Sequence, residues 1–303
     1  MMTLVFSAHH EHADEPSDAP FLPADWPHRM SSRFVMSSGC RWHVQRTGQG
    51  PVMLLIHGTA ASTHTWRDLI PPLAEHFDVI AVDLPGHAFT ERLPSSSMTL
   101  SSLSSALADL LDTLDIEPAH IVGHSAGAAI ALDLTLNRGV NAATLCGINA
   151  ALLPFGGAMQ SLFSPMAQFF ATTRLMPRLL ARRAKDPKAV LRVLKGTGST
   201  LDADGLSFYQ RLFQAEPHLA AVLEMMASWD LQPLVKRLPE LESPLTLLVG
   251  TEDKAISPQE ADKIQRVMPS LVIHRLDGLG HLAHEESPEI IAGLIRQNAR
   301  GTA

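Results

Sequence analysis

The sequence predicts an α/β protein whose mostly parallel sheet is covered by helices on both faces, with a helical cap inserted after the sixth strand. Two observations carry this prediction. Short apolar runs alternate with helix-like segments over residues 52–149 and again over residues 245–300, and this alternation is typical of a parallel sheet that is buried on both faces. Between residues 150 and 241 the alternation stops, and helix-like segments separated by Pro and Gly take its place.

The elements follow in order along the chain. We expect a disordered acidic tail over residues 1–24, and then two antiparallel strands around residues 33–36 and 41–44. The strands of the parallel sheet are expected near Val52, Val79, His120, Ala143, Leu245 and Leu271. The helices between them are expected near Trp66, Leu100, Ala128, Pro258 and Pro288. Residues 25–150 and 242–300 then form the core, and residues 151–241 form the cap.

The composition indicates one soluble α/β domain with an insertion, since 46% of the 303 residues are hydrophobic. The 24 basic and 31 acidic residues give a net charge of −7, which argues against a general nucleic-acid-binding protein. Cys40 and Cys146 are the only cysteines, so we expect no disulfide framework and a reducing cytoplasm. The first residues lack the basic flank of a signal peptide, and no apolar run is long enough for a membrane-spanning helix.

A serine lies at a sharp turn in the middle of the chain. Gly-His-Ser-Ala-Gly at residues 123–127 follows the apolar run 119–122 and opens a helix-like segment. A nucleophile elbow needs small residues on both sides of the serine, because the strained backbone leaves no room for side chains there. A glycine-lined turn with a helix-capping serine is the alternative. The strand before the motif and the helix after it favour Ser125 as a nucleophile.

The partners of a catalytic serine follow in the order Asp, then His. Asp253 comes just after the apolar run 244–250, and His281 lies in a glycine-bracketed loop before the last helix. An imidazole can take the serine proton, and a carboxylate behind the imidazole fixes its tautomer. Glu252 and His284 are the alternatives for these two roles. Asp83, which ends another predicted strand, is expected to serve the fold.

The loop after the apolar run 54–56 is the candidate oxyanion loop, with the backbone N–H groups of Thr59 and Ala126 as its donors. No metal or organic cofactor is needed for this chemistry. The candidate substrate contacts are His57, Gly58, His124, Asn149 and Phe155. We expect hydrogen bonds to hold His57 and His124 around this loop and the elbow, so that neither histidine carries protons.

The cap suggests the kind of ligand. Residues 152–176 are rich in Leu, Met and Phe, which favours a bulky hydrophobic substrate over a sugar or a phosphate. Residues 174–195 then contain eight Lys and Arg against the single acid Asp186. Two interpretations remain open: a solvated helix face, or a surface that contacts an anionic membrane.

The Ser, Asp and His motifs together resemble the α/β-hydrolase superfamily. Further segments are similar to one branch of it, the magnesium-chelatase accessory proteins of bacteriochlorophyll biosynthesis (BchO type). These are residues 25–27, 41–46, 57–64, 147–157 and 196–199. The similarity runs from about residue 25 to the last helix and includes the cap. Ala88 stands where Gly is commoner in the family, which leaves the geometry of the turn over residues 83–88 open.

The resemblance implies a cytoplasmic protein that works beside the insertion of magnesium into protoporphyrin IX, with contact to the inner membrane left open. A tetrapyrrole and the magnesium-chelatase subunits are the partners that it implies. Two functions remain. One is a serine hydrolase acting on an ester or related acyl bond, and the other is a non-catalytic protein that binds a porphyrin or assists the chelatase. The three retained residues Ser125, Asp253 and His281 favour the hydrolase.

Overall fold

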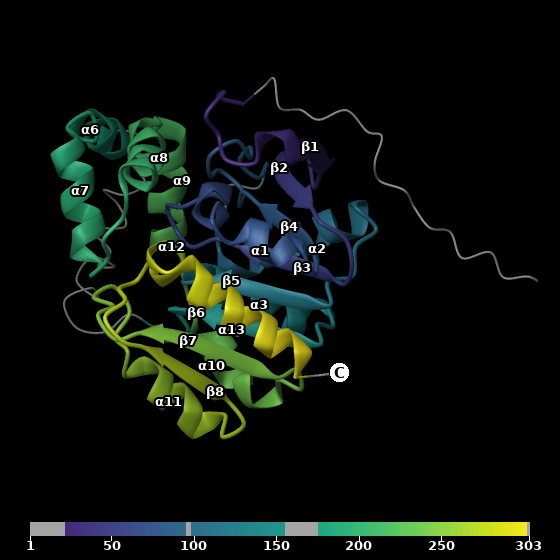
Figure 1. The fold of residues 1–303 in the computed structure, drawn as a ribbon. Helices are drawn as coiled ribbons and strands as arrows, with labels where there is room; N and C mark the ends of the chain where they lie inside the picture. Colours follow the sequence, from purple (N-terminus) through teal and green to yellow (C-terminus); the bar gives the residue numbers. More distant parts are fainter. Residues whose placement is uncertain (1–21, 95–97, 155–174, 302–303) are drawn as a thin grey trace, which may run out of the picture.

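The computed structural model of the chain describes residues 22–94, 98–154 and 175–301. One eight-stranded sheet runs through the molecule in the order β1-β2-β4-β3-β5-β6-β7-β8 (Figure 1). The first two strands form an antiparallel hairpin, β2 is also antiparallel to β4, and all other neighbours are parallel. The strands are β1 (Ser32–Ser37), β2 (Cys40–Thr47), β3 (Val52–Ile56), β4 (Asp78–Val82), β5 (His120–His124), β6 (Thr144–Ile148), β7 (Leu245–Gly250) and β8 (Val272–Leu276). The predicted α/β class with a mostly parallel sheet is confirmed.

Helices cover both faces of this sheet because each presents an apolar stripe to it. On α2 (Leu100–Thr113), Leu103, Leu107 and Leu110 are fully buried at helical spacing, and each contributes about 2 kcal/mol of hydrophobic stabilisation. This helix packs on α3 (Ala126–Arg138) on one face of the sheet. The opposite face is covered by α1 (Ile70–Ala74) and α13 (Pro288–Arg300). The remaining helices of the core are α11 (Glu260–Val267) and α12 (Ala283–Glu286).

Two expected elements differ from the structure. Trp66 ends a short 3₁₀ helix, η3 (Thr63–Trp66), and the α-helix that follows it, α1, begins at Ile70. The expected tail over residues 1–24 also ends earlier than predicted, since Leu22 is buried against Trp26 and cap residues. The rest of that tail lies outside the described residues.

The cap lies between β6 and β7. Its helices are α6 (Leu175–Arg183), α7 (Pro187–Gly196), α8 (Ala203–Gln214) and α9 (Glu216–Ala227), followed by α10 (Gln232–Arg237). Figure 1 shows α6 to α9 as one group, while α10 lies apart from them. Leu234 of α10 belongs to the main core and α10 contacts α3. We therefore propose that the cap ends with α9, so that α10 belongs to the core and not to the cap predicted over residues 151–241.

Candidate active site

Ser125 occupies the turn between β5 and α3 with strained backbone angles, φ 51° and ψ −116°. The turn is possible because Gly127 has no side chain: a Cβ there would lie 2.1 Å from the carbonyl oxygen of Ile56. The Ser125 side chain makes no capping hydrogen bond to α3, so the alternative of a helix-capping serine is not what the structure contains. The geometry is that of a nucleophile elbow.

Asp253 and His281 form a hydrogen-bonded pair. The Nδ1–H of His281 donates to Oδ2 of Asp253 over 2.8 Å, and the other carboxylate oxygen accepts the N–H groups of Ala255 and Ile256. The Asp253 side chain is only 1% exposed, so the acid is held in one orientation. With Nδ1 donating, the Nε2 atom of His281 remains available to accept a proton.

The topology brings these groups to one edge of the sheet. Ser125 follows β5, Asp253 follows β7 and His281 follows β8, and the carboxyl ends of parallel strands meet at the same edge. The residue before Ser125, His124, donates from Nε2 to the backbone carbonyl of His281 over 3.0 Å. No hydrogen bond within the described residues joins the Ser125 hydroxyl to His281, and such contacts often tighten only when substrate binds.

Glu252 and His284, the alternatives for the acid and the base, have other surroundings. Glu252 is exposed, and its backbone N–H donates to the carbonyl of Leu279. His284 is buried, with Nε2 hydrogen-bonded to the Thr65 hydroxyl and its ring 4.9 Å from that of Trp66. The geometry favours Asp253 as the acid and His281 as the base.

The candidate oxyanion loop passes directly beside the serine. A Cβ on Gly58 would lie 3.0 Å from Cβ of Ser125 and 2.8 Å from Nδ1 of His124, so glycine allows this close approach. Thr59 follows in the loop, and Ala126 begins α3, where the N–H groups at a helix start carry partial positive charge. Within the described residues no hydrogen bond uses the backbone N–H of Thr59 or Ala126, which fits donors kept for a ligand.

Two of the residues predicted to contact substrate have other partners. His57 is fully buried: Nδ1 donates to the Gly58 carbonyl and Nε2 accepts the Leu84 N–H. Asn149 donates to the carbonyls of Gly280 and His281 and accepts the Gly250 N–H. These contacts occupy both polar groups of each side chain. For His57 they agree with the expectation that hydrogen bonds hold it around the loop. We propose that Asn149 likewise holds backbone segments in place and does not contact substrate; its partners lie about a hundred residues or more away along the chain, so the sequence alone could not reveal them.

The other predicted contacts fall into two groups. Gly58 and His124 border the serine, and burial together with the nearby His284 and His281 lowers the pKa of His124 well below its usual value, so that this ring stays neutral. Phe155, and most of the cap stretch rich in Phe and Met, lie outside the described residues.

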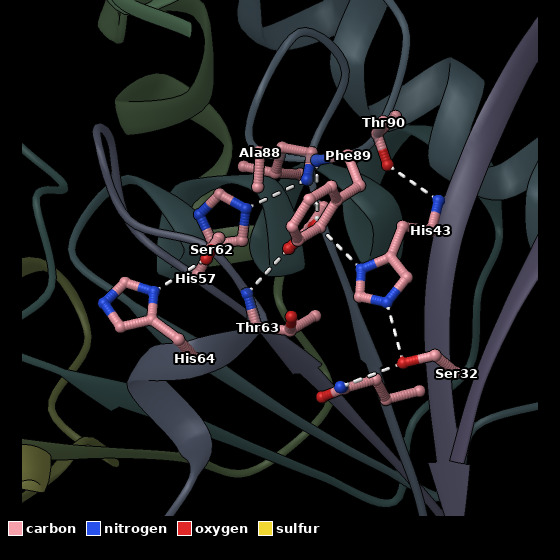
Figure 2. Close-up of polar contacts among 12 residues, drawn as sticks. Ser32, His43, His57, Ser62, Thr63, His64, Ala88, Phe89 and Thr90 are labelled. Carbon is pink, nitrogen blue, oxygen red and sulfur yellow. Dashed lines mark hydrogen bonds and ion pairs between the residues drawn. The ribbon is translucent and has the colours of Figure 1, made fainter. Parts of the chain in front are cut away.

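A second Ser-His-Asp arrangement, which no sequence pattern predicted, lies beside Thr63, just after the candidate oxyanion loop (Figure 2). Asp83 accepts from Nδ1 of His43 and from the Thr63 N–H, each over 2.7 Å, and His43 Nε2 lies 2.9 Å from the Ser32 hydroxyl. Burial raises the pKa of Asp83, but the contacts with His43 and other groups outweigh it and hold the pKa at about 2. All three side chains are completely buried, so this network supports the loop and does not contact substrate.

The topology and this site define the class of protein. The chain belongs to the alpha/beta hydrolase fold family, whose sequence profile matches residues 51–288. Solved structures share the fold: an alpha/beta hydrolase fold protein from Burkholderia ambifaria has a TM-score of 0.74 at 22% identity, covering 88% of this chain and 97% of that one. An esterase from Thermogutta terrifontis has a TM-score of 0.70 at 21% identity, covering 89% and 98%.

Curated relatives place the chain within this family. It is 36% identical over 280 residues to the magnesium-chelatase 30 kDa subunit of Rhodobacter capsulatus, covering 92% of this chain and 98% of that protein. It is also 27% identical over 263 residues to the pimeloyl-acyl-carrier protein methyl ester esterase of Methylococcus capsulatus, covering 84% and 96%. The resemblance to the magnesium-chelatase accessory branch is confirmed.

Proposed function

We propose that the protein is a serine hydrolase that cleaves an ester or related acyl bond. The observation that carries this proposal is the Asp253–His281 hydrogen bond at the sheet edge where Ser125 occupies a strained elbow. His281 takes the proton of the Ser125 hydroxyl, whose oxygen attacks the acyl carbonyl, and the imidazolium then protonates the leaving group. A water activated by His281 next cleaves the acyl-enzyme, releasing the acid and the free serine.

The backbone N–H groups of Thr59 and Ala126 bind the negative oxygen that forms in each step. Removing one such donor typically costs about 3 kcal/mol of transition-state stabilisation. A methyl ester esterase among the relatives supports ester chemistry.

The role of the reaction is proposed from the Rhodobacter capsulatus relative, which is named a subunit of magnesium chelatase. We propose that this protein likewise assists magnesium chelatase in the bacteriochlorophyll pathway, in the cytoplasm, with a bulky hydrophobic compound such as a tetrapyrrole as its ligand. The second candidate is a protein that binds a porphyrin without catalysis. Titration with protoporphyrin IX tests whether the protein binds a tetrapyrrole, through a shift of the Soret band of the pigment, and the labelling experiment described next separates the hydrolase from the pure binding protein, because only the hydrolase needs an activated Ser125.

Labelling with a fluorophosphonate probe tests the hydrolase proposal without knowledge of the substrate. The probe reacts with a serine that a neighbouring base activates, so mass spectrometry should locate it on Ser125 in the folded protein at neutral pH. Ser125→Ala should abolish labelling. If the folded wild-type protein stays unlabelled at this residue, the serine is not activated and the binding protein becomes the better description.

We also propose that the outer helices of the cap contact anionic membrane surfaces. Leu175 and Leu179 of α6 are 74% and 58% exposed, and Val193 of α7 is 57% exposed. Basic side chains surround them; Arg178 pairs with Glu216. The others on these helices and the turn between them are Arg182, Arg183, Lys185, Lys188, Arg192 and Lys195. Each Lys or Arg near an anionic leaflet contributes about 1 kcal/mol. None of the described helices is long and apolar enough to cross a membrane.

Sedimentation with vesicles checks this contact. The protein should pellet with vesicles containing anionic lipid, less with neutral vesicles and less as salt is added, because the attraction is electrostatic. Charge reversal of Arg182, Arg183 and Lys188 should return it to the supernatant. The matched control reverses three exposed charges of the core, Lys236, Lys263 and Arg300. Equal recovery in the supernatant with neutral and anionic vesicles at low salt would exclude membrane contact.

A further inference from the structure

A short segment of the cap lies between the two loops that carry the acid and the base. This segment, Thr197 to Thr200, links α7 to α8 and is called the cap strap below. The carbonyl oxygen of Thr197 accepts two backbone N–H groups, from Lys254 over 3.1 Å and from His281 over 3.3 Å. One peptide group of the cap therefore joins the residue after Asp253 to the catalytic histidine itself.

The cap strap can lie this close to the two loops only because Gly198 and Gly280, which have no side chains, lie at the points of contact. Gly198 has φ +86°, and a Cβ there would lie 1.9 Å from the carbonyl oxygen of Glu252. On the other side, a Cβ on Gly280 would lie 2.4 Å from the carbonyl carbon of Gly198. Because both contacts are with backbone atoms, a side chain at position 198 would fit only if the cap strap or the loop that carries Asp253 (the acid loop) were displaced.

Further hydrogen bonds tie the strap to the histidine loop. The Ser199 hydroxyl is buried and accepts the Leu282 N–H over 2.8 Å. The Thr200 N–H donates to one carboxylate oxygen of Glu286, whose other oxygen accepts the Gly280 N–H, each over 2.7 Å. The residues on both sides of His281 are thus hydrogen-bonded to the strap or to the carboxylate that the strap holds.

The same loop has a second anchor in the cap. Tyr209 of α8 donates from its hydroxyl to Glu285 over 2.8 Å, and Glu285 also accepts from Arg67 of the core. Glu285 is buried with Arg67 and Tyr209 around it, and removing one partner of such a pair is costly. The segment after His281 is therefore hydrogen-bonded to the cap at Leu282, Glu285 and Glu286.

We propose that the cap strap is a positioning element of the catalytic triad, with Ser199 and Gly198 as its positioning residues. They set the place of the His281 loop relative to Asp253, so the cap is part of the catalytic geometry as well as a cover over it. This inference rests on the proposed hydrolase function. A displacement of about 1 Å in such a site can slow reaction by roughly 100-fold.

The test measures fluorophosphonate labelling of Ser125 in the full-length protein, with thermal unfolding recorded for every variant. Ser199→Ala leaves the Leu282 N–H without its acceptor and should slow labelling about 10-fold. Gly198→Ala should slow it about 100-fold, because the acid loop must move. The matched control is Ser207→Ala, which makes the same change at an exposed position of α8 outside the strap and should label at the wild-type rate. Both slow variants should also shift the midpoint of the pH profile of labelling.

A readout that needs no activity separates this inference from the hydrolase proposal. The Nδ1 proton of His281 can be followed by NMR at low field, and Ser199→Ala should shift or broaden it even if the wild type is not labelled. If Ser199→Ala and Gly198→Ala both keep the labelling rate, the pH profile and the proton signal of the wild-type protein, the inference is wrong. It is also wrong if the loss of labelling matches only the fraction of unfolded protein.

Discussion

Asp253→Asn should slow fluorophosphonate labelling of Ser125 by roughly 10⁴-fold. The carboxylate accepts the Nδ1–H of His281 and is itself held by two backbone N–H groups. An amide in its place keeps the size but removes the charge that stabilises the imidazolium, and it can present an N–H group that favours the wrong tautomer of His281. The nucleophile would then lack a competent base although the backbone of the elbow is intact.

The rate of labelling against probe concentration measures this effect. Glu252→Gln is the matched control, because it makes the same chemical change at the neighbouring exposed residue and should label at nearly the wild-type rate. If the two variants exchange these outcomes, Glu252 is the acid and the observed pair is not the one used. Equal labelling of Asp253→Asn and wild type would show that no carboxylate assists His281.

Acidification from pH 7 to pH 5 should lower the free energy of unfolding by about 4 kcal/mol through two buried histidines alone. Burial is the main cause that lowers the pKa of His218 to about 4, and repulsion from the nearby His57 lowers it further. Burial, followed by His281 and Arg67, lowers the pKa of His284 to about 3. In the unfolded chain both rings take up a proton near pH 6.5, whereas the folded protein keeps them neutral. Stability is therefore complete above pH 6.5 and is lost as the pH falls toward the folded-state values.

Urea unfolding at pH 7 and pH 5 checks this expectation. Each histidine accounts for about 2 kcal/mol of the difference, so His218→Gln should remove that amount from it. His218 also accepts the Ala88 N–H and donates to the Ala60 carbonyl, but losing these hydrogen bonds lowers stability at both pH values and leaves the difference unaffected. An unchanged difference in the variant would mean that His218 is protonated in the folded protein at pH 5.

Local sequence patterns were sufficient to predict the sheet and the order of the three candidate catalytic residues along the chain. A glycine-flanked serine between a strand and a helix, and polar residues after later strands, are features of neighbouring residues, and the structure places Ser125, Asp253 and His281 at one sheet edge. The role of Asn149 was not accessible in this way, since its partners Gly250 and Gly280 lie about a hundred residues or more away. The backbone of Asn149 also has a positive φ of 45°, which no local sequence pattern predicted.

The networks around the site were missed for the same reason. His43 lies on a strand where alternation predicts only burial, and its pairing with Asp83 depends on β2 lying next to β4. The α-helix expected near Trp66 is displaced: it begins at Ile70, after a 3₁₀ helix whose Thr63 N–H donates to the distant Asp83. In each case the missing information is which distant segments the sheet brings together.

The hydrogen bonds between the cap strap and residues 280–286 have a consequence for protein engineering and for divergence within the family. Caps are the obvious parts to exchange between hydrolases when a new specificity is wanted. Here, however, Ser199 and Thr200 are hydrogen-bonded to Leu282 and Glu286, which follow His281. A transplanted cap would therefore lack these contacts with the segment that carries the histidine. A chimaera should therefore exchange the cap and residues 280–286 together.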